Sequence, residues 1–225
     1  MTTASETTMS KTTASRTPVT TRGTVVHEYV PLDEGSVHGV TFDGKLVWFA
    51  RNDELVAFDP GTKSVVKRFS LPKAGAGTAF DGTHLYQLAG PEILVVDPAD
   101  GRVVRKLPSP ATGQNSGMAY ADGHLWVGQY RDAKILKIDA KTGELVKTLT
   151  SDRFVTGVSF ADGALWHGVS GDDSPPELRR LAPDGTVEEV VKVDAPMISG
   201  VESDGKGGFF CGGEKGRLRL VKAAS

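Results

Sequence analysis

The 225-residue sequence is poor in cysteine and has no marked excess of charge of either sign. Its single cysteine, Cys211, excludes an intramolecular disulfide and a zinc site built from several cysteines. The net charge at pH 7 is -2, and lysines and arginines are spread along the chain instead of being gathered in one segment. This balance gives no electrostatic reason to expect a nucleic acid or an anionic membrane as a partner.

Long hydrophobic segments are also missing. No stretch approaches the roughly 20 apolar residues that a membrane-spanning helix requires. The first 23 residues are rich in Thr and Ser and nearly free of large apolar side chains, so they lack the apolar region of a secretory signal. Such a segment cannot bury enough surface to offset the entropy of ordering it. We therefore predict a disordered tail over residues 1–23. We also expect the protein to be cytoplasmic and monomeric.

A repeat with a period of about 40 residues occupies the remaining sequence. Each copy begins with a glycine that precedes an apolar run, continues through an Asp-Gly turn, and then reaches a strand-like segment that carries an aromatic residue. Asp-Gly is a strong hairpin signal, so the copies consist of short β-strands. The anchoring glycines are Gly39, Gly77, Gly117, Gly157 and Gly200, and the aromatic residues are Trp48, Tyr86, Trp126, Trp166 and Phe210.

The last copy of the repeat is incomplete. First, second and third strands can be counted five times, but no fourth strand follows "GRLRLVK" at residues 216–222. The segment "TVVHEYV" at residues 24–30 has the composition of a fourth strand such as "SVVKRFS" at residues 64–70. We predict one all-β domain over residues 24–225, a five-bladed β-propeller with four antiparallel strands per blade. Its N-terminal strand would complete the last blade and close the ring.

The copies differ from one another mainly on one predicted rim. The turns between first and second strands are nearly identical, whereas the loops between second and third and between fourth and first strands vary in every copy. Loops on a rigid scaffold often carry binding residues, and a propeller would bring these loops together around one axial funnel. The variable loops also include Ser116, Thr156 and Ser199; the chosen substrate-binding candidates are Arg51, Asn115, Gln129, Tyr130, Arg131, Cys211 and Glu214.

Two histidines are candidates for proton transfer, because imidazole titrates closest to neutral pH. His38 directly precedes an anchoring glycine, and His167 follows an aromatic column residue. A hydrogen-bonded structural role is the alternative for each. Cys211 occupies the same column as His167, one copy further along, where a small buried hydrophobe is the alternative to a Cys–His nucleophilic pair.

Neither a metal nor another cofactor is predicted. A calcium site on the axis needs several converging oxygen ligands, but the equivalent first-strand positions contain one carboxylate: they are Thr41, Ala79, Ala119, Ser159 and Glu202. The segment "IDAKTGELV" at residues 138–146 is similar to a quinoprotein repeat, yet the tryptophan that follows the turn in that pattern is absent. A quinone cofactor is rejected on that ground.

The phrases "HGVTFDGKLVWFA" and "ELVAFDP", with their later copies, resemble the propeller superfamily of virginiamycin B lyase-like and gluconolactonase (senescence-marker)-like proteins. The resemblance covers nearly everything after residue 23 and implies the propeller fold. Those families have seven and six blades, and the metal carboxylates of the gluconolactonases have no evident counterpart here, so no functional residue is carried over. Plant-type glutaminyl cyclases are five-bladed, but their acidic and aromatic signature segments are not seen in this chain.

Two functions from different classes remain open. The leading hypothesis is a small-molecule enzyme, a lyase, cyclase or hydrolase, that uses His38 and His167 for general acid–base chemistry in the axial funnel, without a redox cofactor. Tyr130, Arg51 and Arg131 would then hold or polarise an anionic or carbonyl group. The alternative is a non-catalytic scaffold that presents the same rim to a peptide, a protein or a small ligand.

Overall fold

The computed structural model describes residues 17–51, 53–110 and 114–224. These residues form twenty β-strands, and no helix occurs among them. Accordingly, the described part of the chain contains no helix that is long and apolar enough to cross a membrane. Residues 1–16 of the predicted tail lie outside the described residues.

The strands form three antiparallel sheets of four strands each and one sheet of eight strands. Unit 1 contains β2 (His38–Phe42), β3 (Val47–Arg51), β4 (Glu54–Asp59) and β5 (Ser64–Ser70). Unit 2 contains β6 (Ala74–Phe80), β7 (Leu85–Ala89), β8 (Glu92–Val96) and β9 (Val103–Pro108). Unit 3 contains β10 (Asn115–Ala121), β11 (His124–Gln129), β12 (Lys134–Asp139) and β13 (Leu145–Thr150).

The eight-stranded sheet has two halves. The first half, unit 4, contains β14 (Val155–Ala161), β15 (Ala164–Val169), β16 (Glu177–Leu181) and β17 (Val187–Val193). The second half, unit 5, contains β18 (Val201–Ser203), β19 (Gly208–Gly212), β20 (Leu218–Ala223) and the N-terminal strand β1 (Val19–Tyr29). The spatial order β14-β15-β16-β17-β1-β20-β19-β18 places β1 between the two halves.

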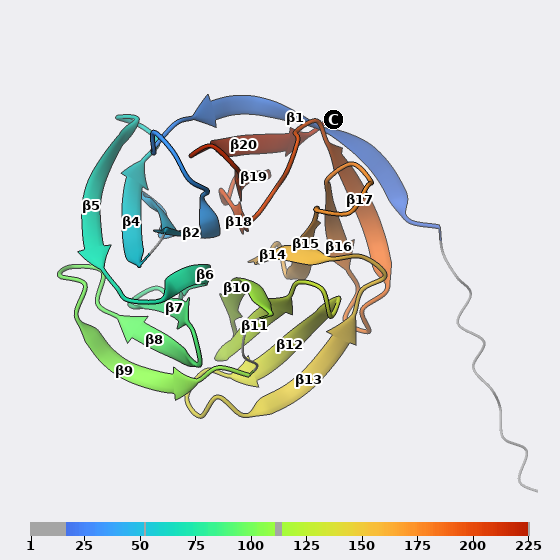
Figure 1. Cartoon of the computed structure of the whole chain (residues 1–225). Helices are drawn as coiled ribbons and strands as arrows, with labels where there is room; N and C mark the ends of the chain where they lie inside the picture. The colour runs from blue at the N-terminus through green and yellow to red at the C-terminus, as the bar shows by residue number, and fades with distance from the viewer. Residues whose placement is uncertain (1–16, 52, 111–113, 225) are drawn as a thin grey trace, which may run out of the picture.

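Strand β1, near the N-terminus, lies beside β20, the last strand of the chain (Figure 1). Residues Gly23–Tyr29 pair antiparallel with β20, as the sequence predicted for residues 24–30. The strand begins earlier than the predicted boundary, because Val19–Gly23 pair in parallel with β17. A Cβ atom on Gly23 would lie 2.9 Å from Cγ1 of both Val191 and Val221. Glycine therefore suits the point where β1 passes from one half of the sheet to the other.

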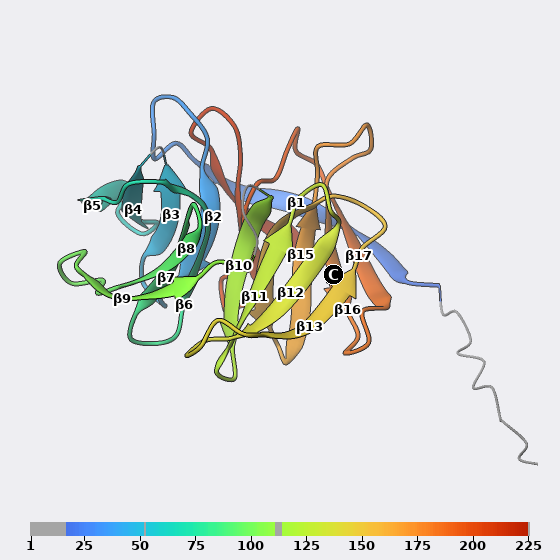
Figure 2. The same ribbon diagram turned by 60° about the horizontal axis from the view of Figure 1, so that its bottom comes forward.

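The sheets surround a central axis like the blades of a propeller (Figures 1 and 2). The first strands β2, β6, β10, β14 and β18 lie innermost (Figure 1). At the anchoring glycines these strands approach very closely. A Cβ atom on Gly77 would lie 2.6 Å from the backbone carbon of Gly117, and one on Gly200 would lie 2.8 Å from the nitrogen of Val40. Any larger residue would force the inner strands apart.

The apolar core fills the spaces between neighbouring units. Trp48 of unit 1 is 1% exposed and belongs to a cluster with Leu85 and Leu94 of unit 2. Trp166 of unit 4 packs against Phe209 of unit 5, with ring centroids 4.8 Å apart. The repeated aromatic residues therefore hold adjacent sheets together, and large aromatic side chains supply much of the burial energy in such cores.

Candidate functional site

A cavity of about 540 Å³ opens at one end of the axis. Its floor contains the residue that precedes the anchoring glycine in every unit. Because the glycines hold the inner strands together, the residues directly before them meet around the axis. These floor residues are His38, Ala76, Ser116, Thr156 and Ser199.

The polar floor residues are committed to different degrees. The Ser116 hydroxyl donates a hydrogen bond of 2.6 Å to the carbonyl of Val155, and the Ser199 hydroxyl donates to the carbonyl of Val37. Each of these bonds joins one unit to the next. By contrast, the buried hydroxyl of Thr156 has no hydrogen-bond partner among the described residues.

His38 is the imidazole that the fold brings to this floor. Burial lowers the pKa of its side chain from the ordinary 6.5, because a desolvated site disfavours the charged form. The ring is therefore predominantly neutral at pH 7 and has a nitrogen lone pair available. A neutral imidazole in a cavity can accept a proton from a bound molecule.

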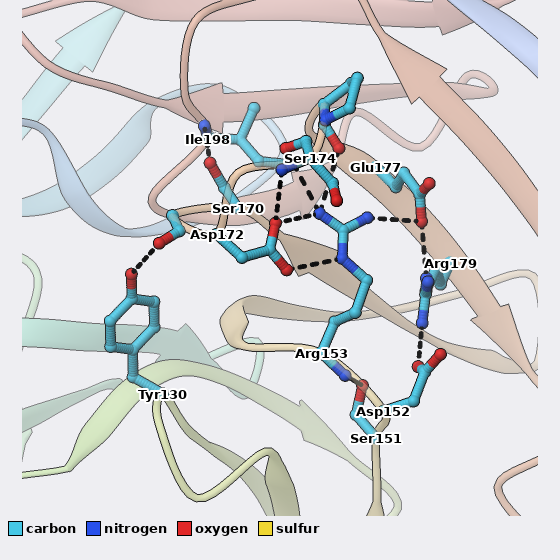
Figure 3. Close-up of polar contacts among 12 residues, drawn as sticks. Tyr130, Ser151, Asp152, Arg153, Ser170, Asp172, Ser174, Glu177, Arg179 and Ile198 are labelled. Atoms are coloured by element: carbon cyan, nitrogen blue, oxygen red, sulfur yellow. Dashed lines mark hydrogen bonds and ion pairs between the residues drawn. The ribbon is translucent and has the colours of Figure 1, made fainter.

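The cavity wall consists of loops from units 3, 4 and 5. Tyr130 and Arg131 follow β11, and Ser170 and Gly171 follow β15. The Tyr130 ring packs against Phe154, with ring centroids 4.9 Å apart, and its hydroxyl reaches the carbonyl of Gly171 at 3.5 Å (Figure 3). Tyr130 thus connects two of the loops that enclose the cavity.

A charged network anchors the unit 4 loop behind this wall (Figure 3). Arg153 donates to both carboxylate oxygens of Asp172, one of them at 2.7 Å, and lies 3.1 Å from Glu177. Arg179 bonds to Glu177 at 2.8 Å and also to Asp152. The hydrogen bonds from Arg153 hold the pKa of Asp172 below its usual range. This network fixes the loop after β15 and pairs each of its three carboxylates with an arginine, which leaves one excess negative charge in the network.

His167, the other proton-transfer candidate, lies outside the cavity lining. It is 0% exposed and sits on β15 between Val158 of β14 and Arg179 of β16. Neither ring nitrogen has a hydrogen-bond partner among the described residues. Burial, reinforced by the positive charge of Arg179, lowers the pKa of His167 to about 4. The structure therefore places a neutral imidazole inside unit 4, away from the cavity surface.

Cys211 is also enclosed by the core. It is 0% exposed and belongs to a cluster with Trp166 and Val201. Burial raises the pKa of its thiol to about 12, so the side chain stays a thiol at neutral pH. Its surroundings match those of a small buried hydrophobe, because a nucleophilic cysteine needs its thiolate form.

The remaining sequence candidates divide between the cavity and its surroundings. Asn115, Tyr130 and Arg131 line the cavity together with His38, and the Asn115 amide donates to the Ser109 hydroxyl at 2.6 Å. Three other candidates, Arg51, Gln129 and Glu214, do not belong to the lining. The sequence reasoning did not select Thr156, although its place before an anchoring glycine is the same signal that selected His38.

A carboxyl group lies on the inner strands beyond the ring of glycines. Glu202 accepts hydrogen bonds from the hydroxyls of Ser159 at 2.8 Å and Thr41 at 3.1 Å, which belong to the two neighbouring units. Burial raises the pKa of Glu202 to about 7. No three or more His, Cys, Asp and Glu side chains come together in a metal-binding arrangement among the described residues.

Comparison with known proteins relates the repeat to an established family. The family model for the outer membrane protein assembly factor BamB matches residues 43–182, which is more than half of the chain. The protein belongs to the BamB family. Membership in the BamB family supports the predicted relationship to β-propeller proteins, but it does not single out the virginiamycin B lyase-like or gluconolactonase-like group. No curated protein matches the sequence at significant similarity.

Solved structures show the same fold at low sequence identity. Myxococcus xanthus glutaminyl cyclase matches 93% of this BamB-family chain and 100% of its own chain, with a TM-score of 0.77 and 17% identity. The WD40 β-propeller domain of Doa1 matches 81% of this chain and 62% of its own, with a TM-score of 0.53 and 16% identity. At such identities the similarity concerns the fold alone.

Proposed function

We propose that the protein is a small-molecule enzyme of the lyase, cyclase or hydrolase group that performs general acid–base chemistry in the axial cavity. The observation that carries this proposal is the neutral imidazole of His38 on the cavity floor. A base whose pKa is lowered by burial is unprotonated at neutral pH and can remove a proton from a bound substrate. The cavity volume lies within the roughly 300–1,000 Å³ that small-ligand sites occupy.

The wall supplies groups that complement such a base. Arg131 and the Tyr130 hydroxyl lie at the same cavity, where they can stabilise negative charge that develops on a carbonyl or a leaving group. The structural similarity to a glutaminyl cyclase supports the cyclase member of the proposed group, since that protein uses the same fold. The ligand would be a small organic molecule and the protein would act as a monomer.

We also infer that the propeller has five blades. Units 1, 2 and 3 are separate four-stranded sheets, and the eight-stranded sheet divides into units 4 and 5 of four strands each. The parallel pairing of β1 with β17 joins these two units into one sheet. This count supports one blade for each anchoring glycine.

A non-catalytic scaffold is the second candidate. Membership in a family described as an assembly factor and the aromatic pair of Tyr130 and Phe154 beside the exposed Arg131 support it. Aromatic and arginine side chains are enriched at the centres of protein interfaces. In this case the same wall would contact a peptide or a protein, and His38 would contribute only to the shape of the floor.

The decisive experiment separates turnover from binding. The wild-type protein and His38→Gln are incubated with a panel of small esters, lactones and N-terminal glutaminyl peptides, and products are followed by mass spectrometry. We expect His38→Gln to abolish turnover while it leaves ligand affinity within about tenfold, or roughly 1.4 kcal/mol. His27→Gln, which changes an exposed histidine on β1, is the control. Turnover at the wild-type rate in His38→Gln would show that His38 is not the base.

A further inference from the structure

We infer that the axial cavity selects a small organic molecule with a single negative charge, which Arg131 binds at the wall while Thr156 contacts a polar group of the molecule on the floor. The inference narrows the substrate class of the proposed function and rests on that function's use of the same cavity. It is supported by the charges of the described residues that line the cavity and by the Thr156 hydroxyl, which has no hydrogen-bond partner among the described residues.

Among the described residues, the lining has one formal charge at neutral pH. Arg131 is exposed and makes no ion pair among the described residues, and no carboxylate side chain lines the cavity in the described part of the chain. The burial of His38 favours its neutral form. An ammonium group in the cavity would therefore find no carboxylate partner, whereas a carboxylate would find a guanidinium group, which matches its geometry.

The carboxylates behind the wall do not cancel this charge. Asp172 forms an ion pair with Arg153. Glu177 forms ion pairs with both Arg153 and Arg179. Asp152, the third carboxylate of the network, has a side chain that is 76% exposed, so solvent screens it. Asp132 and Asp173, which directly follow Arg131 and Asp172, are exposed as well and do not belong to the lining. Among the described residues, the charged group that lines the cavity is therefore Arg131.

Thr156 marks the place of a second contact on the floor. Its equivalents Ser116 and Ser199 bond to a carbonyl of the next unit, but the Thr156 hydroxyl is buried without a partner in the described structure. Buried hydroxyls are nearly always hydrogen-bonded. The Thr156 side chain lines the cavity while its hydroxyl is enclosed beside Gly168, so the contact that we infer requires a rotation of Thr156 about χ1 when the ligand binds. Thr156 lies between Ser116 and Ser199 in the ring of floor residues, whereas Arg131 belongs to the wall. A ligand would therefore contact the two residues with different parts of its surface.

Matched pairs of small ligands test the charge selection. The full chain is titrated calorimetrically with N-acetyl amino acids and with their C-terminal carboxamides, which have nearly the same shape but no charge. We expect at least one acid to bind ten or more times as tightly as its carboxamide. Arg131→Gln should weaken acid binding at least tenfold and remove the preference. Arg102→Gln, which changes an exposed arginine in the turn between β8 and β9, should leave it intact.

Thr156→Val tests the floor contact with nearly the same side-chain volume. We expect it to weaken acid and carboxamide to the same degree, by about fivefold or more, and to keep the preference for the acid. The free protein should melt no lower than the wild type, because the lost hydroxyl has no partner in the described structure.

The inference is overturned if no acid is preferred to its carboxamide, if Arg131→Gln keeps the preference, or if Thr156→Val binds as tightly as the wild type. These are binding measurements, so their outcome is independent of turnover. Selective binding of acids without any turnover would contradict the proposed enzyme but support the anion site. Turnover of neutral substrates alone, dependent on His38, would support the enzyme and overturn the anion site.

Discussion

At the scale of single residues, burial acts in opposite directions on the pKa values of two ionisable side chains. It lowers the pKa of His167 to about 4 and raises that of Glu202 to about 7, because in each case the charged form loses hydration. The contribution of Glu202 to stability is full below its ordinary pKa of 4.5 and is lost as the pH rises through 7. That of His167 is full above 6.5 and is lost as the pH falls toward 4.

We predict that His167→Val removes part of the acid sensitivity of the fold. Between pH 7 and pH 4 the wild type should lose about 3 kcal/mol of unfolding free energy through His167, since one pKa unit corresponds to about 1.4 kcal/mol. Valine occupies the equivalent position 127 in unit 3 and does not titrate. Urea unfolding at pH 7 and pH 4.5 measures the effect, with the variant expected to be the more stable protein at pH 4.5. Parallel pH profiles would show that His167 is already solvated or paired.

At the scale of elements, β1 serves both halves of the eight-stranded sheet. Its later residues cover the outer edge of β20, and its first residues extend the edge of β17. An uncovered edge strand exposes backbone groups and promotes aggregation. The closure of the ring therefore depends on β1, which lies near the N-terminus but completes unit 5 by pairing with β20 near the C-terminus.

A series of N-terminal deletions should separate these two contributions. Removing residues 1–16 should leave the melting temperature nearly unchanged, because the sequence predicts a disordered tail there. Removing 1–23 should lower it by several degrees, since the parallel pairs with β17 are lost. Removing 1–29 should give an aggregating protein, as β20 then becomes an edge. Calorimetry and light scattering measure these effects; a stable monomer beginning at residue 30 would contradict the role of β1 in closure.

At the scale of the whole molecule, the close approach of the inner strands brings the cavity floor together. The floor residues belong to different units and are adjacent only because the glycines beside them allow the inner strands to meet. A change at one glycine should therefore affect both stability and the cavity, even though the glycine contributes no side chain.

Two glycines of β6 provide a matched pair for this prediction. A Cβ atom on Gly77 would lie 2.6 Å from backbone atoms of unit 3, whereas one on Gly75 would meet nothing within 4 Å. We expect Gly77→Ala to cost about 3 kcal/mol of unfolding free energy through overpacking. Gly75→Ala should stay within about 1 kcal/mol of the wild type. Denaturant unfolding of both variants measures the difference, and equal stabilities would show that the inner strands can separate without cost.

Local signals were sufficient for the strands and the turns, and the missing fourth strand of the last repeat copy was sufficient for the pairing of residues 24–29 with β20. Asp-Gly turns, the apolar runs after the anchoring glycines and the aromatic column each depend on short stretches of sequence, and their repetition at a regular interval indicates sheets around an axis. The pairing of Val19–Gly23 with β17 has no such signal, because that segment is Thr-rich and its partner lies far along the chain.

The composition of the cavity depended on the packing of different units against one another. His38 and His167 were equivalent candidates in the sequence, but His38 reaches the axial floor and His167 is enclosed in unit 4, because their positions on the inner and second strands face different surroundings. Similarly, Thr156 occupies the same place as Ser116 and Ser199 in the repeat, but its hydroxyl has no hydrogen-bond partner among the described residues, whereas theirs bond to the next unit. Such contacts are made between strands that are distant in sequence, so no local pattern can specify them.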